Sequence, residues 1–251
     1  MSKMELALQQ ARRSLVIARK DIRIYYSKGP VVIFGLLFPV FLFLSYMINR
    51  HLSAESMMPG LVGMILFFTA TAISPIVAPW EAQARTLERL MSCPVRAETI
   101  IMGDILASFI FGLGISLVPI IIGLSLGVGI SMPVVFGLAL VLTAFCFASL
   151  GQVFSIPPTN VPATANMISS VVKFPMVFIS GIFVPLQELP TWAQGISYIS
   201  PLTYFTDIAR RSMQDEGHLN AGIDILALLA FTILFSSVAM WAHRQTMPRR
   251  I

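Results

Sequence analysis

Long apolar runs alternate with short polar segments along the 251-residue chain. At a rise of 1.5 Å per residue, each run is long enough to cross the roughly 30 Å hydrocarbon core of a bilayer as a helix. The pattern predicts an all-α, polytopic membrane protein with a single transmembrane domain over residues 1–251. Its six transmembrane helices are expected at 31–48, 58–78, 100–124, 133–154, 167–184 and 223–242.

The segment before the first run has a helical periodicity of its own. Apolar residues recur every three or four positions from Met4 to Tyr25, and arginines and lysines occupy the other faces. Such a helix suits the membrane interface, with its apolar side among acyl chains and its basic side toward anionic headgroups. We therefore predict an N-terminal interfacial amphipathic helix over residues 1–29. The alternative is a soluble helix packed on a partner.

Residues 80–98, here called the hook, form a charged segment between the second and third runs. Four of its apolar residues recur at spacings of four, three and four, as on one face of a short helix. Pro94 is expected to end this helix, because proline disfavours helical geometry in the residue before it. The pattern predicts a docking stripe for another protein, or else a solvated loop between two helix ends. The candidate contact residues are Trp80, Glu81, Ala84, Arg85, Leu87, Glu88, Arg89 and Met91.

The segment between the fifth and sixth runs is too broken by proline to span a membrane and too apolar for a free loop. Its periodicity predicts two short helices within residues 188–211, which re-enter the outer leaflet. Ser200 and Pro201 would begin the second helix as N-cap and first-turn proline. We expect its aromatic residues in the interfacial belt rather than in a cage for a cationic ligand. The candidate gate residues are Pro185, Leu189, Trp192, Ile196, Pro201 and Tyr204.

Composition supports the membrane class. The chain is 56% hydrophobic and only 12% charged, whereas about a quarter of the residues in a soluble domain are charged. The net charge of +5 does not indicate nucleic-acid binding, because the basic residues lie beside the apolar runs, where they serve orientation and lipid contact. Thirteen lysines and arginines lie on the side of the N-terminus and the hook, against three on the other side. This positive-inside bias predicts a plasma-membrane protein with both termini and the hook in the cytoplasm.

Two charged residues fall inside predicted transmembrane helices. Asp104 lies near the cytoplasmic end of the third, and Lys173 lies somewhat deeper in the fifth. Charges at such depth are costly and usually face protein or water. Their opposite signs and similar depth predict an intramembrane ion pair; a snorkelling lysine and a proton or substrate relay are the alternatives.

Several signatures of chemistry are missing from the sequence. It contains no phosphate-binding loop of the G-x-x-x-x-G-K-[ST] type, so we expect no nucleotide hydrolysis by this chain. No metal-ligand cluster or G-x-S-x-G nucleophile elbow occurs either. The two cysteines, Cys93 in the hook and Cys146 in an apolar run, imply no disulfide. We therefore expect no enzyme and no bound cofactor.

Two long motifs carry a resemblance to a known family. The runs EAQARTLERLMSCPVRAETIIMGDI and GIFVPLQELPTWAQGISYISPLTYFTDIAR, together with the six-span pattern, resemble type-2 ABC exporter permeases of the drug and polysaccharide exporter type. The resemblance implies an interfacial helix at residues 4–26, a coupling helix at 80–92 that docks on an ATPase subunit, and re-entrant helices at 188–211. One departure is Arg85, which stands where glycine is common in the family.

The expected function is that of a transmembrane permease subunit that moves an amphipathic or lipid-like substrate out of the cytoplasm. The resemblance implies that ATP and Mg²⁺ are held by the ATPase subunit, and that a second permease chain completes the transporter, with a homodimer favoured. Membrane lipids are the remaining partners. The alternative is an ion-coupled secondary transporter or channel without an ATPase. Such a carrier is expected to show paired intramembrane carboxylates or broken helices in inverted repeats.

Overall fold

The computed structural model describes residues 3–26, 29–47, 54–93, 95–157 and 159–246. The described residues form helices and connecting turns without any strand, which confirms the all-α fold class. The elements are α1 (Lys3–Asp21), the π-helical turn η1 (Ile22–Tyr26), α2 (Gly29–Met47), α3 (Ala54–Ala70), α4 (Ser74–Gln83), α5 (Thr86–Met91), α6 (Ala97–Ser125), α7 (Pro133–Phe154), α8 (Pro162–Ile179), the 3₁₀ turn η2 (Leu186–Glu188), α9 (Thr191–Ser197), α10 (Pro201–Gln214) and α11 (Ala221–Thr246).

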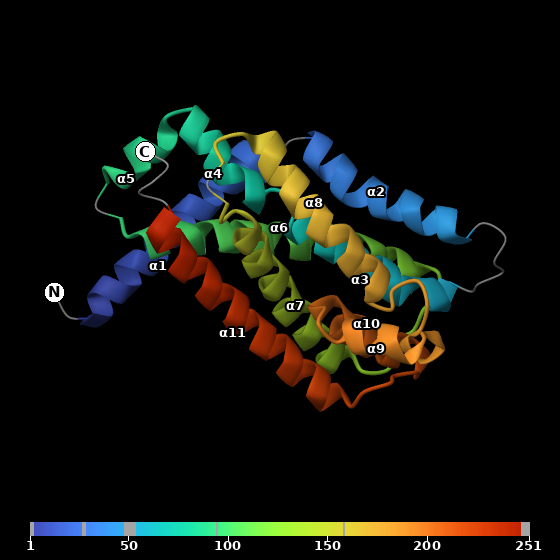
Figure 1. The fold of residues 1–251 in the computed structure, drawn as a ribbon. Helices are drawn as coiled ribbons and strands as arrows, with labels where there is room; N and C mark the ends of the chain where they lie inside the picture. Colours follow the sequence, from blue (N-terminus) through green and yellow to red (C-terminus); the bar gives the residue numbers. More distant parts are fainter. Residues whose placement is uncertain (1–2, 27–28, 48–53, 94, 158, 247–251) are drawn as a thin grey trace.

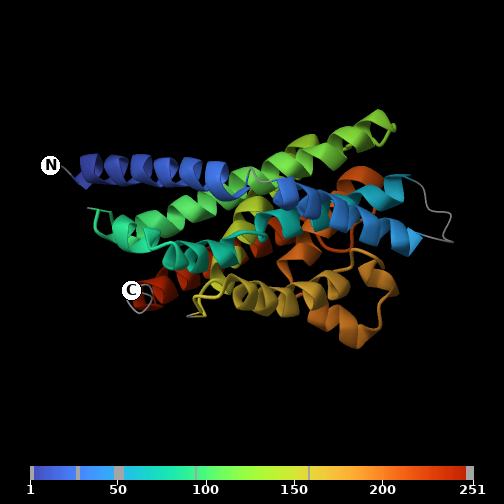
Figure 2. The same cartoon turned by 90° about the horizontal axis from the view of Figure 1, so that it is seen from above.

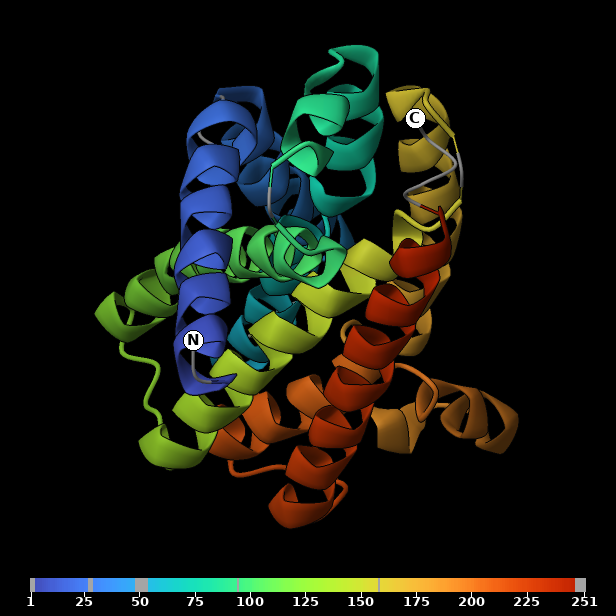
Figure 3. The same ribbon diagram turned by 90° about the vertical axis from the view of Figure 1, so that its left-hand side faces the viewer.

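The long helices form one bundle with two distinct ends (Figure 1). The hook helix α5, the start of α1 and the end of α11 lie at one end, whereas α9, α10 and the start of α11 lie at the other. Seen from above, α1 and α8 lie on opposite sides of the bundle (Figure 2). Figure 3 looks onto the hook end and shows α1 crossing in front of α6. The hook and the predicted re-entrant helices, which the charge count assigns to different sides of the membrane, thus lie at two separate ends of the molecule.

Five helical segments are long and apolar enough to cross a membrane by length and composition, namely Glu55–Gln83, Ala97–Ser125, Pro133–Phe154, Pro162–Ile179 and Ala221–Thr246. A sixth arises when the bent pair Leu8–Tyr26 and Val31–Ser45 is counted as one span; its two parts meet at 88°. The multi-pass architecture expected from the apolar runs is therefore confirmed.

Two predicted runs differ most from the helices of the structure. The second run, expected as one helix over 58–78, is divided into α3 and α4. The break has a local cause: Pro75 lacks the N–H that would donate to the carbonyl of Thr71, four residues earlier. The fifth run begins at Pro162 rather than at 167, since proline suits a first helical turn, and it ends at Ile179 rather than at 184. Gly181, with φ of +75°, follows this end.

Helix α3 forms the centre of the bundle. Its side chains Val62, Met64, Leu66 and Phe67 are fully buried, and Phe67 packs edge-on against Phe147 of α7 with ring centroids 5.0 Å apart. Helix α6 approaches α3 so closely that a Cβ on Gly112 would lie 2.7 Å from Cβ of Ala70. Small residues thus permit close helix packing here, as expected within lipid.

The outward faces of several helices are apolar and exposed in the single chain. Large side chains of this kind lie on α2, α8 and α11, and include Phe41, Val171, Phe178, Leu226 and Ile233. In a bundle whose core is already filled by α3, such faces suit hydrocarbon or another membrane helix.

Candidate functional site

The hook consists of two helices rather than one. Helix α4 ends at Gln83, and α5 begins at Thr86. Between them Arg85 adopts the left-handed conformation, with φ of 54°. The single helix expected across Trp80 to Met91 is therefore wrong, because a left-handed residue cannot continue a right-handed helix. Glycine adopts this conformation without steric strain, which gives a physical reason for its occurrence at this position in the family that the sequence resembles.

The break at Arg85 divides the predicted docking stripe. Trp80 is half-buried and stacks on Tyr25 of η1, with ring centroids 5.5 Å apart and an interplanar angle of 17°. Ala84 is exposed at the turn, as are Arg85, Glu88 and Arg89 around it. Leu87 and Met91 belong to α5, but their side chains lie outside the described ones. The structure therefore separates an inward-facing part of the hook from an exposed tip.

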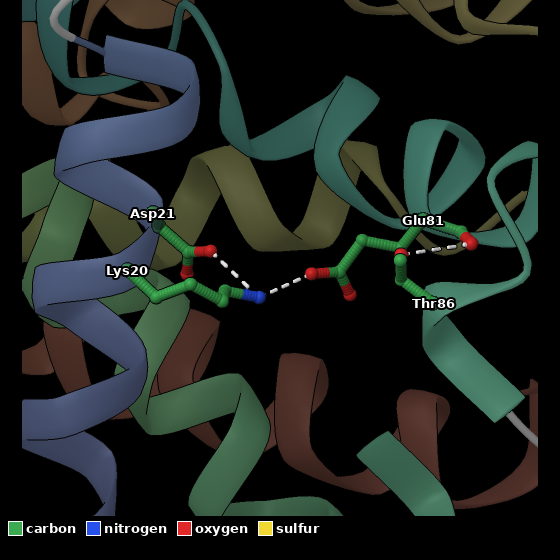
Figure 4. A network of polar contacts seen from close by, with 4 residues as sticks. All are labelled: Lys20, Asp21, Glu81 and Thr86. Carbon is green, nitrogen blue, oxygen red and sulfur yellow. Dashed lines mark hydrogen bonds and ion pairs between the residues drawn. The ribbon is translucent and has the colours of Figure 1, made fainter. Parts of the chain in front are cut away.

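Glu81 belongs to the inward-facing part and joins the hook to α1. Its carboxylate accepts a hydrogen bond from Nζ of Lys20, and the two form an ion pair (Figure 4). Lys20 also lies 3.0 Å from Oδ1 of Asp21. Thr86, the first residue of α5, donates through Oγ1 to the carbonyl of Glu81 at 3.2 Å. The expectation of Glu81 as a docking contact is thus not supported by its position, since its side chain is only 4% exposed.

The carboxyl groups near Lys20 outnumber the cation. Asp21 is fully buried, and its carboxylate forms an ion pair with Lys20. Asp104 of α6 lies close enough to Asp21 and Lys20 for their charges to act on one another. Three acidic side chains, Asp21, Glu81 and Asp104, therefore share one lysine at the junction of α1, α4 and α6. Removal of that lysine would leave buried carboxyl groups without a counter-charge.

A second set of polar contacts continues from this junction into the bundle. The hydroxyl of Tyr26 lies 2.6 Å from Oγ of Ser108 on α6 and 3.4 Å from Oγ of Ser74 on α4. On the other side, Ser14 of α1 donates to the carbonyl of Thr99 at 3.0 Å. These buried bonds join α1 and η1 to both helices that flank the hook.

Asp104 and Lys173, expected to form an ion pair, are not brought together. Among the described residues no ion pair includes either of them. Asp104 interacts with Asp21 instead, and Lys173 donates from Nζ to the carbonyl of Thr71 at 2.6 Å. That carbonyl is the one that loses its helical partner at Pro75, so the lysine replaces the missing backbone donor.

The predicted re-entrant segment forms short helices at the end opposite the hook. Pro185 and Leu189 flank η2 (Leu186–Glu188), which precedes α9 and α10. Trp192 and Ile196 of α9 face outward, and Trp192 is 71% exposed. Pro201 is buried in the first turn of α10. Tyr204 donates from its hydroxyl to the carbonyl of Tyr198 at 2.8 Å, which fixes α10 against α9.

Two grooves lie between α2 and α8, and the sequence did not indicate them. The outer groove, of about 620 Å³, is lined by Phe38, Phe41, Leu42, Phe178, Phe183 and Val184 together with Ser45. The inner groove, of about 480 Å³, extends from Phe38 to Val31 on α2 and includes Asn166, Ser170 and Lys173 on α8. Phe38 belongs to both grooves.

An aromatic triad stands where the two grooves meet. The rings of Phe38, Phe68 and Phe174 contact one another pairwise, with centroids 5.2, 6.0 and 6.1 Å apart. Eighteen phenylalanines in the sequence gave no signal for this triad, because ordinary core packing uses the same residues.

Comparison with known proteins adds to this geometry. A family model described as ABC-2 type transporter matches residues 11–214. ABC transporter G family member 20 of Dictyostelium discoideum is 30% identical over 194 residues, which are 72% of this chain and 26% of that protein. The probable multidrug ABC transporter permease YbhR of Escherichia coli is 25% identical over 197 residues, or 74% of this chain and 51% of that one. Nodulation protein J of Sinorhizobium fredii is 26% identical over 192 residues, or 74% and 72%.

The chain spans only about a quarter and about half of the first two relatives. The family match itself covers most of the chain and includes the hook, α2 to α9 in full and the predicted re-entrant segment. Together with the all-helical fold and its apolar spans, it confirms the resemblance drawn from the two sequence motifs. The chain therefore belongs to the ABC-2 type transporter family, and its described residues include several helices long and apolar enough to cross a membrane.

Proposed function

We propose that this chain is the permease subunit of an ABC exporter that moves an amphipathic or lipid-like substrate out of the cytoplasm. The observation that carries the proposal is the hook, whose exposed tip is attached through Glu81 and Lys20 to a buried network at the junction of α1, α4 and α6. An ATPase subunit that holds ATP and Mg²⁺ would dock on this tip. Movement of the tip would then reach α1, α4 and α6 together.

The exposed tip suits a protein partner better than solvent alone. Ala84, Arg85, Glu88 and Arg89 are exposed around the turn and the short α5. A six-residue helix is too short to be stable on its own. The hydrogen bond from Thr86 to the carbonyl of Glu81 stabilises its first turn, and a docked partner would stabilise it further. Charged residues at the rim of such a contact contribute about 0 to 1 kcal/mol each, so apolar residues of α5 would carry most of the affinity.

A second copy of the chain would complete the transporter. Six membrane-crossing segments are half of the number that the resembling family implies, and paired identical subunits with two-fold symmetry are the commonest soluble assemblies. The exposed apolar faces of α2, α8 and α11 offer surfaces for that copy and for lipids. The two grooves between α2 and α8 supply an apolar route that suits an amphipathic substrate.

The partner and the coupling role are tested with one pair of variants in the hook. The tagged chain is purified from its native membranes, the co-purifying ATPase is identified by mass spectrometry, and its ATP hydrolysis is measured. Burial of a leucine contributes about 1.5 to 3 kcal/mol, so Leu87→Asp should weaken co-purification about tenfold or more. Glu88→Ala, one residue further along α5, should change it less than fivefold. Normal co-purification and ATPase stimulation by Leu87→Asp would refute the docking role.

Orientation is tested with a thiol already present in the chain. Cys93 is exposed at the hook end, and Cys146 is buried. An impermeant thiol reagent applied to intact cells should label a Gln214→Cys variant at the opposite end and should leave Cys93 unlabelled until the membrane is opened. The reverse pattern would place the hook and both termini outside the cytoplasm, where no ATPase could drive it.

The ion-coupled alternative makes a different prediction for the same protein. The paired carboxyl groups of Asp21 and Asp104 are the kind of feature that such a carrier uses. They lie at the hook junction, however, where Lys20 already neutralises part of their charge. Transport into vesicles that contain the purified chain and its ATPase should require ATP and should survive collapse of ion gradients. Transport driven by a gradient without ATP would favour the carrier.

A further inference from the structure

The inner groove between α2 and α8 has one polar wall and one apolar wall. Asn166, Ser170 and Lys173 follow each other on α8 at spacings of four and three residues, so they share one face of the helix. The opposing wall is formed by apolar residues of α2 and of the α3–α4 segment, such as Val31, Phe68 and Ile76. A cavity of about 480 Å³ with a few polar groups on an apolar background has the character of a ligand pocket.

Lys173, on the polar wall, is a buried ammonium group whose donors are not all used by described residues. The residue is 4% exposed, and in the described part of the chain no carboxylate forms an ion pair with it. Its one hydrogen bond goes to the carbonyl of Thr71, and the ring of Phe154 lies 5.8 Å from Nζ. An ammonium group has three donors, so two are left after Thr71. A buried cation without an anion is costly.

Of the neighbours of Lys173 on α8, Asn166 can donate to an anion, whereas the hydroxyl hydrogen of Ser170 is already used. Ser170 donates its hydroxyl hydrogen to the carbonyl of Asn166 at 2.8 Å, and the Asn166 side chain is exposed in the same groove. An amide and an ammonium seven residues apart lie on one side of the helix, about two turns from each other. Beyond Lys173, Phe174 belongs to the aromatic triad at the end of the groove.

We propose that the inner groove binds the anionic group of an amphipathic substrate through Lys173, with the apolar body of that substrate against the facing wall of α2 and α3. The inference rests on the proposed export function and narrows its substrate class to amphiphiles that carry a carboxylate or phosphate. Neutral and cationic amphiphiles would leave the ammonium unpaired and bind less well. The aromatic triad lies at the outer end of this binding position.

Binding is measured on the purified chain in nanodiscs of zwitterionic phosphatidylcholine, so that no ATPase is needed. Ser170→Cys is introduced after Cys93 and Cys146 are replaced by serine and alanine, and its rate of reaction with N-ethylmaleimide reports occupancy of the groove. The probes are oleate, oleyl alcohol and oleylamine, which share one chain and differ in charge. Oleate should protect the thiol at about tenfold lower concentration than either of the others.

Variants of Lys173 separate its charge from its bond to Thr71. Lys173→Arg keeps the charge and should keep the preference for oleate. Lys173→Met removes both the charge and the donor, and Lys173→Gln removes the charge but keeps a donor; both should lose the preference. Elution of each variant as a single species in gel filtration identifies the folded protein. Equal protection by oleate and oleyl alcohol in the unmodified groove, or an unchanged preference in Lys173→Gln, would overturn the proposal.

A last arm distinguishes a transported substrate from a bound lipid. In the complex with the ATPase, addition of ATP should release the protection given by oleate, because a substrate leaves during turnover. Protection that persists through ATP hydrolysis would mean a resident anionic lipid and would overturn the substrate assignment. A disturbed hook variant such as Leu87→Asp should still bind oleate without ATP, so failure of the export proposal and failure of this one give different results.

Discussion

The ion pair between Lys20 and Glu81 gives a sharp test of how the hook is held. Lys20→Met keeps most of the apolar stem but leaves Asp21 and Glu81, which are 0% and 4% exposed, without their cation. Loss of one partner of a buried pair costs about 3 to 5 kcal/mol. Because the side chain of Lys20 is 30% exposed, water screens part of the interaction, and we expect about 3 kcal/mol, the lower end of that range.

The chain supplies a matched control for this substitution. Arg244 and Glu98 form an ion pair with Nε and Oε1 2.7 Å apart, yet their side chains are 62% and 34% exposed. An exposed pair contributes about 0 to 1 kcal/mol, so Arg244→Met should have little effect. The comparison therefore holds the chemistry nearly constant and varies the burial.

The assay is the midpoint of thermal unfolding, followed by fluorescence-detected gel filtration in detergent. A loss of 1 kcal/mol lowers the midpoint by about 2 to 4 °C in a chain of this size, so Lys20→Met should lower it by about 6 to 12 °C. Arg244→Met should lower it by less than about 4 °C. Partial restoration is expected in Lys20→Met/Glu81→Leu, where the Glu81 charge is gone but Asp21 still lacks its cation. Equal effects of Lys20→Met and Arg244→Met would show that burial at the junction does not decide its strength.

Two further predictions use the same assay. Arg85→Gly should raise the midpoint by about 1 to 4 °C. Glycine removes the left-handed strain at φ of 54°, and this gain exceeds its cost of about 0.5 to 1 kcal/mol in chain entropy. Arg89→Gly inside α5 is the control and should lower the midpoint. Gly103→Val should lower it by about 2 to 12 °C through overpacking, because a Cβ there would lie 2.6 Å from Cγ2 of Ile17. Gly114→Val on the same helix, where a Cβ meets nothing within 4 Å, is the control and should be nearly neutral.

The sequence predicts the helices well, because each apolar run carries its own signal. The fourth run was expected at 133–154, and α7 is Pro133–Phe154. The apolar pattern predicts the second run as one continuous helix, which is wrong, because apolar residues lie on both sides of the break. Pro75 lacks the N–H that would donate to the carbonyl of Thr71, four residues earlier, and α3 ends at Ala70. The break therefore lies several residues before residue 78, where the run was expected to end.

The candidate site was predictable only in part. The position of the hook follows from local pattern, whereas the Lys20–Glu81 bond joins residues 61 positions apart. A single sequence holds no information about which distant charges meet, and opposite signs at similar depth led to the wrong partner for both Asp104 and Lys173. The burial of the Glu81 side chain likewise depends on the packing of α1 against α6. Gly103 makes this close packing possible.

Helix α4 belongs to both the hook and the inner groove, and this sharing connects the two proposals. Its first residues follow Ile73, which with Ile76 lines the groove, and its last turn carries Trp80 and Glu81, which bind η1 and α1. The backbone is broken before α4, at the carbonyl held by Lys173, and after it, at Arg85. A ten-residue helix with a break in the helical backbone at each end is a rod of about 15 Å that could shift as one piece. A displacement of α5 that reaches α4 through the hydrogen bond from Thr86 to Glu81 would either break the ion pair between Glu81 and Lys20 or shift α4. A shift of α4 would move a wall of the groove that faces Lys173.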